Sequence, residues 1–327
     1  MRRYAAHLPY VDFPSLGEGS TPLIELAALA RTVGIGKLWA KNEGQNPTGS
    51  HKDRMSALVV ARAAALGRRT VVAASSGNGG VSLAAYAGAA GLHCVIIATS
   101  TISPVWARAI RLAGGELMLT ETSQARWRSM GQRVEKDGWY PVTNYVHPPT
   151  GSNPFGVQGY KTVAYEIVEQ CGDHPPTVIV VPTSRGDLLW GLWQGFVEAR
   201  HHALLGALPR LVAVEPVPRL SRILQGEDYR QTFPRGAHTM TSIGGTTATY
   251  QSVVALRDSR GSAVEVSTPE AEAAQQELAR GGLYAELSSA AALAGLRVLL
   301  SRGHLDGTDR VVVVLTSHGY KEDVARE

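Results

Sequence analysis

The chain has 327 residues, of which 44% are hydrophobic and 18% are charged, and its formal net charge is +4 at pH 7. A chain of this length predicts two domains of roughly 150 residues each. Its Lys and Arg residues lie singly or in pairs, which is not typical of proteins that follow a nucleic-acid backbone, and no run of 18 apolar residues is present.

Residues 1–19 lack the apolar region of a signal peptide, and the two cysteines, Cys94 and Cys171, each lie in an apolar stretch. The two cysteines are 77 residues apart in the sequence and form no Cys-x-x-Cys pair. These features predict two buried thiols, no disulfide, no metal site, a location in the cytoplasm, and neither nucleic acid nor membrane as a partner.

Short β-branched runs alternate with alanine-rich stretches along the chain. Runs that are apolar at nearly every position are typical of parallel strands that helices bury on both faces. This order predicts an α/β protein with doubly wound open sheets. We expect strands at 70–74, 94–98, 177–181, 211–215 and 311–315, with helices at 81–90, 104–113 and 188–199.

A segment rich in Pro, Gly, Ser and Asn divides the predicted strands into two sets. It spans Val146–Gly156 and is typical of a crossing between domains. The sequence therefore predicts a smaller domain at 36–145 and a larger one made of 1–35 with 146–327. Ligands of open parallel sheets bind at the carboxyl ends of the strands, so we look for chemistry in the turns that follow them.

The first turn with residues suited to chemistry is Asn46–Arg54, which lies ahead of a helix predicted at Met55–Leu66. Gly49 permits a tight turn and Ser50 can cap the helix, which places Lys52 in the first helical turn. The positive end of the helix dipole disfavours an ammonium group there and favours the free amine that a Schiff base requires. From this segment alone, an exposed lysine without function is an equal alternative.

The turn Ser75–Gly80 follows the strand predicted at 70–74 and consists of small residues around Asn78. Small residues let backbone amides approach an anion, and Asn78 offers an amide for a neutral or phenolic oxygen. A glycine-rich turn in isolation is as often a plain connection, so this segment indicates a binding site only together with other motifs.

A third turn lies between the strand and the helix that open the second set. The hydroxyls of Thr183 and Ser184, with the backbone amides of the turn, suit a phosphate at a helix N-terminus, and Arg185 adds a positive charge. Gly186 permits the turn, while Asp187 opposes the charge of Arg185 and is expected to cap the helix.

Seven segments of the chain occur in the order in which threonine synthases have them, and together they cover it from end to end. The chain therefore resembles the fold-type-II enzymes that depend on pyridoxal phosphate (PLP), the group of the tryptophan synthase β chain. Within this group it is most similar to threonine synthases. The segments are Gly17–Leu23, Lys41–Glu43, Asn46–Arg54, Ser75–Gly80, Gly159–Ile167, Glu286–Gly295 and Leu315–Lys321.

The resemblance implies two doubly wound domains with PLP in the cleft between them and Lys52 as the Schiff-base lysine. It implies that Lys52 also exchanges protons with carbon atoms of the substrate, and that Asn78 bonds the phenolic oxygen of PLP. The third turn takes the position of the family's phosphate loop without its usual run of Gly and Asn. By that position, the PLP phosphate is assigned to Thr183, Ser184, Arg185, Gly186 and Asp187.

Thr316 aligns with the hydroxyl that meets the pyridine nitrogen of PLP in this family. A hydroxyl does not hold that nitrogen protonated, so elimination and replacement are favoured over transamination. The resemblance also implies a homodimer and an amino-acid substrate. Substrate contacts are expected from Ser75, Ser76, Gly77, Gly79, His51 and Asn153.

The chain departs from the family at one charged position. Threonine synthases share the pattern Asn-Pro-Tyr-Arg-x-Glu-Gly-x-Lys-Thr, whose Arg helps to hold the phosphate of O-phosphohomoserine. Here the stretch is Asn153–Thr162, with Gly156 in place of that Arg. Loss of this charged fork is expected to weaken binding of a dianionic leaving group unless another cation replaces it.

Two further departures concern His51 and the segment Ile243–Thr249. His51 stands where the family has an aromatic residue, and it serves either as a proton shuttle or as a ring packed against the cofactor. Ile243–Thr249 stands where the family has Ile-Gly-Asn-Pro, and its stretch Thr246–Thr249 either contacts the substrate or forms a turn.

The leading interpretation is a PLP-dependent lyase or synthase of amino-acid metabolism that labilises a Cα–H bond, expels a β- or γ-substituent and adds a nucleophile. Conversion of O-phosphohomoserine to threonine is the best named case. The alternative is a serine or threonine dehydratase or a β-replacement synthase, including one of secondary metabolism. A catalytically silent binding protein would be expected to lack the lysine, whereas Lys52, Asn78 and Thr316 are all in place.

Overall fold

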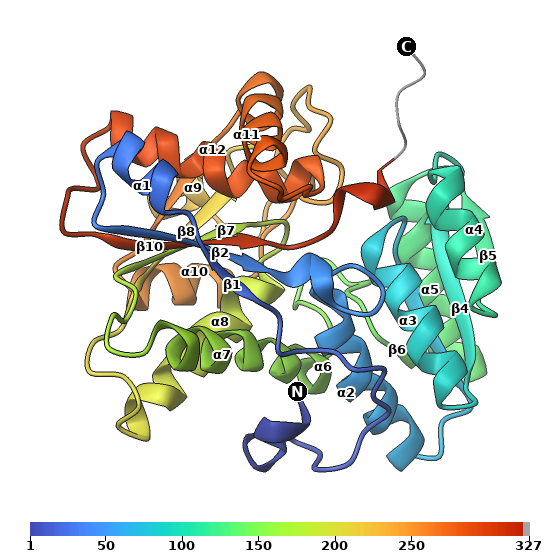
Figure 1. Cartoon of the computed structure of the whole chain (residues 1–327). Helices are drawn as coiled ribbons and strands as arrows, with labels where there is room; N and C mark the ends of the chain where they lie inside the picture. Colours follow the sequence, from blue (N-terminus) through green and yellow to red (C-terminus); the bar gives the residue numbers. More distant parts are fainter. Residues whose placement is uncertain (323–327) are drawn as a thin grey trace. The chain divides into compact units, whose positions relative to one another are not determined.

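The structure is a computed structural model that describes residues 1–322. The described chain forms two compact units, each with a sheet of its own (Figure 1). Unit 1 consists of Met1–Gly19, Asn46–Tyr160 and the C-terminal residues from Lys321, and unit 2 of Ser20–Gln45 and Lys161–Tyr320. The prediction of an α/β protein with two open sheets is confirmed.

Unit 1 is built around four parallel strands in the order β5-β4-β3-β6. Alternate side chains point to opposite faces, because Val72 and Val95 cluster with Met130 of α5 whereas Ile96 lies against Gly80 of α3. The strands are β3 (Thr70–Ala74), β4 (His93–Thr99), β5 (Glu116–Thr120) and β6 (Tyr140–Pro141), and the helices are α2 (Lys52–Ala65), α3 (Asn78–Ala89), α4 (Pro104–Leu112), α5 (Ser123–Asp137) and α6 (Pro154–Val157), with 3-10 turns η1 (Arg2–His7) and η3 (Gln158–Tyr160).

Unit 2 is built around six strands in the order β1-β2-β10-β7-β8-β9, of which only β1 runs antiparallel to its neighbour. Helices α1, α11 and α12 cover one face of this sheet and α7, α8 and α10 the other (Figure 1). Gly295 of α12 allows a close approach, since a Cβ there would lie 2.4 Å from Val214.

The strands of unit 2 are β1 (Leu23–Glu25), β2 (Lys37–Asn42), β7 (Val178–Pro182), β8 (Arg210–Glu215), β9 (Ser262–Glu265) and β10 (Arg310–Leu315). Its helices are α1 (Ala27–Val33), α7 (Lys161–Cys171), α8 (Asp187–His201), α9 (Leu220–Leu224), α10 (Tyr250–Asp258), α11 (Thr268–Arg280) and α12 (Leu287–Ser301), with the 3-10 turns η2 (Glu43–Gln45) and η4 (Gly319–Lys321).

The five predicted strands all form, with ends that differ by at most one residue. Strand β2 was not predicted, and it pairs with β10, which places residues 37–42 in the sheet of unit 2. The polar Lys41 hides this strand from an apolar pattern, yet Lys41 is fully buried because its amino group pairs with Glu166 at 2.8 Å.

Three further expectations concern cysteines, metals and membranes. Cys94 and Cys171 are both buried and both free, as predicted. Within residues 1–322, no group of three or more metal-binding side chains is found. No helix in the same range has the length and apolar character needed to cross a membrane.

Candidate active site

Lys52 is the first residue of α2, so the predicted position in a first helical turn holds, although the helix begins three residues earlier than predicted. Its half-buried amino group donates a hydrogen bond of 3.3 Å to the hydroxyl of Tyr160 and lies 5.6 Å from the centre of that ring. The helix N-terminus disfavours a positive charge at this position. A neutral phenol as partner adds no negative charge that would hold the ammonium form.

Tyr160 is a site residue to which the sequence analysis gave no role. It is fully buried, its hydroxyl lies 3.6 Å from the sulfur of Met55, and its ring centre lies 5.4 Å from that of His51. His51 is therefore packed against the ring of Tyr160, and both roles considered for it, a proton shuttle and a ring packed against the cofactor, stay predictions. A contact over a separation of 108 residues leaves no periodic signal in the sequence.

The predicted cap of α2 is wrong. His51 precedes the helix without a side-chain cap bond, and the buried Ser50 hydroxyl has no hydrogen-bond partner among the described residues. Asp53 of the first turn accepts a bond of 2.7 Å from the backbone N–H of Thr48 instead. A carboxylate reaching back from inside the helix thus orders the turn, because it carries charge that the helix N-terminus favours.

Asp53 is fully buried beside Lys52. Burial raises the pKa of its carboxyl, and hydrogen bonds from Thr48 and Ser82 and the positive charge of Lys321 oppose that shift. Lys321 donates to the carbonyl of Thr48 at 2.7 Å, so this lysine holds the same turn.

The turn Ser75–Gly80 joins β3 to α3, and Asn78 is the first residue of that helix, 7% exposed. The hydroxyl of Ser75 accepts a bond of 3.0 Å from the N–H of Gly80, which leaves its hydrogen available to a substrate oxygen. A Cβ on Gly79 would lie 3.3 Å from that hydroxyl, and one on Gly77 would lie 3.3 Å from the Trp106 ring. Glycine at these two positions therefore lets the backbone lie close to the Ser75 hydroxyl and to the Trp106 ring.

Asn153, predicted to contact the substrate, makes three structural bonds with its side chain. The carbonyl caps α6 by accepting 3.1 Å from Phe155 N–H, and the amide donates to the Tyr140 hydroxyl at 3.0 Å and to the Pro141 carbonyl at 3.1 Å. These bonds use both amide hydrogens. The side chain thereby ties α6 to β6.

Gly156 lies inside α6 and packs on α2. A Cβ at this position would lie 2.8 Å from the Met55 Cγ and 3.1 Å from the Val59 Cβ, both in α2. The departure from the threonine synthase pattern is thus part of the packing, because an arginine at position 156 has no room without movement of α6 or α2.

In unit 2 the turn after β7 carries the residues assigned to a phosphate. Gly186 has a φ of 100°, and a Cβ there would lie 2.2 Å from Ser252, so glycine is required on both grounds. Gly186 rather than Asp187 is the N-cap of α8, and Asp187 is the first helical residue, which corrects the predicted cap. The first N–H groups of a helix lack intrahelical partners and suit an anion.

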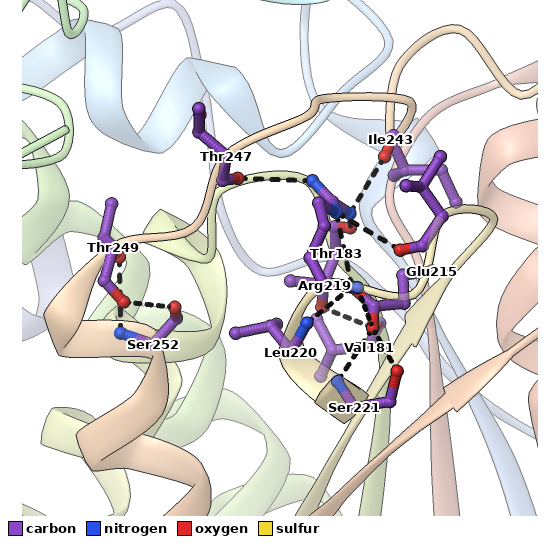
Figure 2. A network of polar contacts seen from close by, with 11 residues as sticks. Val181, Thr183, Glu215, Arg219, Leu220, Ser221, Ile243, Thr247, Thr249 and Ser252 are labelled. Atoms are coloured by element: carbon purple, nitrogen blue, oxygen red, sulfur yellow. Dashed lines mark hydrogen bonds and ion pairs between the residues drawn. The ribbon is translucent and has the colours of Figure 1, made fainter. Parts of the chain in front are cut away.

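A buried ion pair stands behind this turn (Figure 2). The fully buried Arg219 donates to the carbonyl of Thr183 at 2.9 Å and pairs with Glu215 at 3.3 Å. It also donates to the carbonyls of Ile243 at 3.3 Å and Thr247 at 3.4 Å. Burial lowers the pKa of Arg219, which the charge of Glu215 opposes. One guanidinium therefore joins the start of the turn to the segment Ile243–Thr249.

Thr249 joins the same segment to the middle of the turn. Its hydroxyl and its N–H both donate to the carbonyl of Arg185, at 3.0 Å and 3.3 Å. The same hydroxyl accepts from the N–H of Ser252 and so caps α10 (Figure 2). Both bonds of Thr249 are internal to the protein, and a substrate contact of Thr246–Thr249 stays a prediction.

Arg185 itself is half-buried, and burial lowers the pKa of its guanidinium while the charge of Asp187 opposes that shift. Ser184 lies beside Gly245, where an added Cβ would lie 2.9 Å from the serine hydroxyl. The pair Gly244–Gly245 stands where the family has Gly-Asn. Because Gly245 has no Cβ, the hydroxyl of Ser184 has room beside it.

Thr316 follows β10 and is 6% exposed. Since Val313 pairs with Val180, the same offset brings Thr316 opposite Thr183, so the two assigned groups lie at the same edge of adjacent parallel strands. The Thr316 hydroxyl lies 2.8 Å from that of Ser289 in α12, a second residue without a role in the sequence analysis. Two hydroxyls, and not a carboxylate, meet at this position.

These groups fit the functional parts of PLP. Unit 1 presents Lys52 and Asn78 at the N-termini of two helices, which suits an aldehyde and a phenolic oxygen. Unit 2 presents Thr316, which suits a ring nitrogen, and beside it the turn at 183–187, where only a residue without Cβ fits and a helix begins. Asp187 opposes a phosphate dianion, and Arg185 favours it.

Comparison with known proteins shows the family of this chain. Residues 14–317 match the family described as "Pyridoxal-phosphate dependent enzyme". The chain is 31% identical to the threonine synthase of Methanocaldococcus jannaschii, over 98% of this chain and 80% of that protein. It is 32% identical to that of Halalkalibacterium halodurans, over 98% of this chain and 89% of that protein.

Among solved structures, the crystal structure of O-ureido-L-serine synthase is 25% identical, with a TM-score of 0.74, over 93% of this chain and 90% of that one. The predicted fold type, the enzymatic character and the cofactor are thereby confirmed. The chain belongs to the family of pyridoxal-phosphate dependent enzymes.

Proposed function

We propose that this enzyme is a threonine synthase-like lyase or synthase that catalyses elimination and replacement at Cβ or Cγ of an amino acid. Its best named reaction is the conversion of O-phosphohomoserine to threonine. The observation that carries the proposal is the near full-length similarity of this chain to threonine synthases. In this chain, Lys52 lies at the N-terminus of α2 beside a neutral phenol.

The roles of the cofactor residues follow from their chemistry. Bound PLP supplies an electron sink that makes the Cα–H bond of an amino acid acidic. Lys52 would hold the cofactor through its amino group and would move the proton at the substrate carbons. Asn78 would donate to the phenolic oxygen, Thr316 would meet the ring nitrogen, and the turn at 183–187 would bind the phosphate.

The roles of the substrate residues rest on the turn Ser75–Gly80. The Ser75 hydroxyl has a hydrogen to donate, and the amides at the start of α3 add the positive end of a helix, so a substrate carboxylate is stabilised there. Tyr160 keeps the Lys52 amino group in place between proton transfers. Positioning of this kind contributes to the rate because the reacting atoms start close together.

The alternative is a serine or threonine dehydratase or a β-replacement synthase. Two observations favour it: no side chain fits at position 156 for a γ-phosphate, and O-ureido-L-serine synthase is 25% identical over 93% of this chain. A catalytically silent binding protein remains the third hypothesis, and the presence of Lys52, Asn78 and Thr316 argues against it.

The test is a titration of the PLP-loaded protein, followed through the absorbance of its Schiff base. Addition of O-phospho-L-homoserine should change the spectrum and release phosphate, and Lys52→Ala should abolish both. A response only to L-serine or L-threonine would assign the enzyme to the dehydratase and replacement group. If borohydride reduction leaves Lys52 unmodified in the PLP-loaded wild type, the enzymatic role of Lys52 is refuted.

We also propose that the enzyme is a homodimer of the cytoplasm. This proposal is supported by the similarity of the chain to its family. The expectation of a homodimer comes from that resemblance. Light scattering on the PLP-loaded protein after size-exclusion chromatography tests this: a dimer has twice the mass of the 34.8 kDa chain.

A further inference from the structure

Two backbone amides of the turn after β7 have no acceptor in the described chain. Neither the N–H of Ser184 nor that of Gly186 donates a hydrogen bond within residues 1–322, and Gly186 is a buried residue. Backbone N–H groups of buried residues almost always have a partner. An amide of this kind therefore points to a ligand, and the proposed function gives this turn the phosphate of PLP.

The first of these amides, that of Ser184, takes its direction from Arg219. In a trans peptide, the C=O of one residue and the N–H of the next point in opposite directions. The peptide bond between Thr183 and Ser184 is trans. The Thr183 carbonyl accepts a hydrogen bond of 2.9 Å from Nη2 of Arg219 (Figure 2). The N–H of Ser184 must therefore point to the side opposite the guanidinium.

Thr249 directs the second amide in the same way. Its hydroxyl and its N–H both donate to the Arg185 carbonyl, so the N–H of Gly186 points away from Thr249. The two sets of donors belong to one network, because Arg219 also holds carbonyl groups of the segment that ends at Thr249. Both amides thus point away from their part of this network, where an anion can accept from them.

The turn depends on such bonds for its shape. Gly186 is the single glycine of the turn at 183–187, and it has the single positive φ there. The rest of the turn is held by hydrogen bonds from side chains, of which the bond from Arg219 has a charged donor. Hydrogen bonds from a charged donor are roughly twice as strong as neutral ones. Arg219 is therefore expected to fix the start of the turn most firmly.

The burial of Arg219 suits a residue that holds the turn and does not touch the ligand. Arg219 is fully buried and paired with Glu215 at 3.3 Å, and its Nε also donates to the Val217 carbonyl at 3.3 Å. Taking an ion pair out of water costs free energy, and well-packed apolar side chains in its place are often as stable. The pair is therefore better explained by the shape it gives to the turn than by stability.

We propose that Arg219 is a positioning residue for the phosphate of the cofactor, because it holds the Thr183 carbonyl so that the N–H of Ser184 faces the phosphate. Thr249 has the same effect on Gly186 through neutral donors. This inference rests on the proposed function, because it assumes that the turn at 183–187 binds the phosphate of PLP.

The experiment compares PLP with pyridoxal, which lacks the phosphate, as ligands of the full-length apo-protein. The ratio of the two dissociation constants, obtained from fluorescence titrations, measures what the phosphate adds to binding. Arg219→Met should reduce this ratio by about 10-fold, the effect of one hydrogen bond to a charged group, and change the affinity for pyridoxal little. Arg219→Lys should recover part of the ratio because it keeps a charged donor.

Arg310→Met is the matched control. Arg310 also holds a backbone carbonyl next to β7, since its Nε donates to Pro175 at 2.6 Å, but Pro175 precedes the strand. Loss of this bond should lower stability and leave the ratio unchanged. Circular dichroism and thermal midpoints show whether each variant is folded. If Arg219→Met does not fold, Arg219→Lys is judged by its ratio against wild type in the same way.

Three results would overturn the proposal. Equal losses of affinity for PLP and pyridoxal, or an unchanged ratio, would mean that Arg219 serves the fold alone. The same fall of the ratio in Arg310→Met would trace it to general destabilisation. A wild-type ratio near one would mean that the turn does not bind the phosphate. None of these titrations contains an amino acid, so a failure of the proposed reaction with O-phospho-L-homoserine leaves their result standing.

Discussion

Among the lysines with a side-chain partner in this structure, Lys52 differs in the chemistry of that partner. Lys41 donates to the carboxylate of Glu166 at 2.8 Å and Lys161 to that of Glu198 at 2.9 Å. Lys52 donates to the phenol of Tyr160. A carboxylate partner favours the ammonium form, whereas a neutral phenol does so much less. The contrast supports the proposal that Lys52 acts as the nucleophile.

The first prediction concerns Tyr160→Phe. The substitution removes the hydroxyl that holds the Lys52 amino group and keeps the ring that packs on His51. We expect kcat to fall by about 5- to 10-fold, since a typical hydrogen bond contributes about 1 kcal/mol, and the pH dependence of kcat to change. Stopped-flow and steady-state kinetics of the PLP-loaded variant measure both.

Tyr86→Phe is the matched control for this prediction. Its hydroxyl, equally buried in unit 1, donates a hydrogen bond of 2.7 Å to Glu18. Loss of that bond should lower stability and leave the pH dependence of kcat unchanged. If Tyr160→Phe behaves like Tyr86→Phe, Tyr160 does not position the lysine.

The second prediction concerns Gly156. An added Cβ meets the Met55 Cγ at 2.8 Å, so Gly156→Ala should destabilise the protein by about 1–3 kcal/mol through overpacking. Gly206→Ala, where no atom lies within 4 Å of the added Cβ, is the control and should change stability little. Urea unfolding measures both. Equal unfolding midpoints for the two variants would show that α6 moves to accept the added methyl group without a loss of stability.

At the scale of helices and strands, the sequence predicts best what depends on local pattern. The strands at 70–74 and 311–315 are apolar at almost every position, and they form within one residue of the predicted ends. The turns at Lys52, Ser75–Gly80 and 183–187 follow from the family motifs and lie at helix N-termini.

What the sequence misses depends on contacts between distant segments. Lys41 hides β2 from an apolar pattern until it pairs with Glu166, and Tyr160 gains its proposed role only from Lys52, which the fold brings near. The caps expected from Ser50 and Asp187 fail because cap propensity describes isolated helix ends, whereas these ends are shaped by tertiary bonds.

The third prediction concerns the tie between α10 and the turn at 183–187. Thr249→Val removes the hydroxyl that donates to the Arg185 carbonyl and caps α10, while the N–H bond remains. We expect weaker PLP binding, by about 5- to 10-fold, and a loss of about 1 kcal/mol of stability. Thr249→Ser should retain both. Fluorescence titration of the apo-protein with PLP measures the affinity.

Thr177→Val is the control for this prediction. Thr177 lies directly before β7, the strand that ends at the turn 183–187. Its hydroxyl donates to Asp309 at 2.7 Å, before β7 begins. Stability should fall by a similar amount and PLP affinity should stay unchanged. A parallel loss of affinity in both variants would trace the effect of Thr249→Val to general destabilisation.

At the scale of the whole molecule, the two cysteines report on the two units separately. Cys94 lies in β4 of unit 1 and Cys171 at the end of α7 in unit 2. Burial raises the pKa of the Cys94 thiol to about 12 and that of Cys171 to about 11, from an ordinary value of 9.0. At pH 8 both are therefore protonated in the folded state and poorly reactive.

The sign of the linked pH effect follows from these values. Above pH 9 the unfolded thiols ionise while the folded ones keep their protons, so the unfolded state binds fewer protons. The free energy of unfolding should then fall as the pH rises from 9 towards 12. Cys94→Ala and Cys171→Ala should each reduce this fall, which denaturant titrations at pH 8 and pH 10 can measure.

The single-thiol variants also test whether PLP engages both units. Labelling of a buried thiol by a disulfide reagent at pH 8 requires opening of its unit, and a ligand that binds only the closed state slows it. Because the proposed cofactor residues belong to unit 1 through Lys52 and to unit 2 through the turn at 183–187, PLP should slow labelling of Cys94 and of Cys171 alike. Slowing at Cys94 alone would confine the cofactor contacts to unit 1 and refute the phosphate assignment, whereas slowing at Cys171 alone would refute that of Lys52.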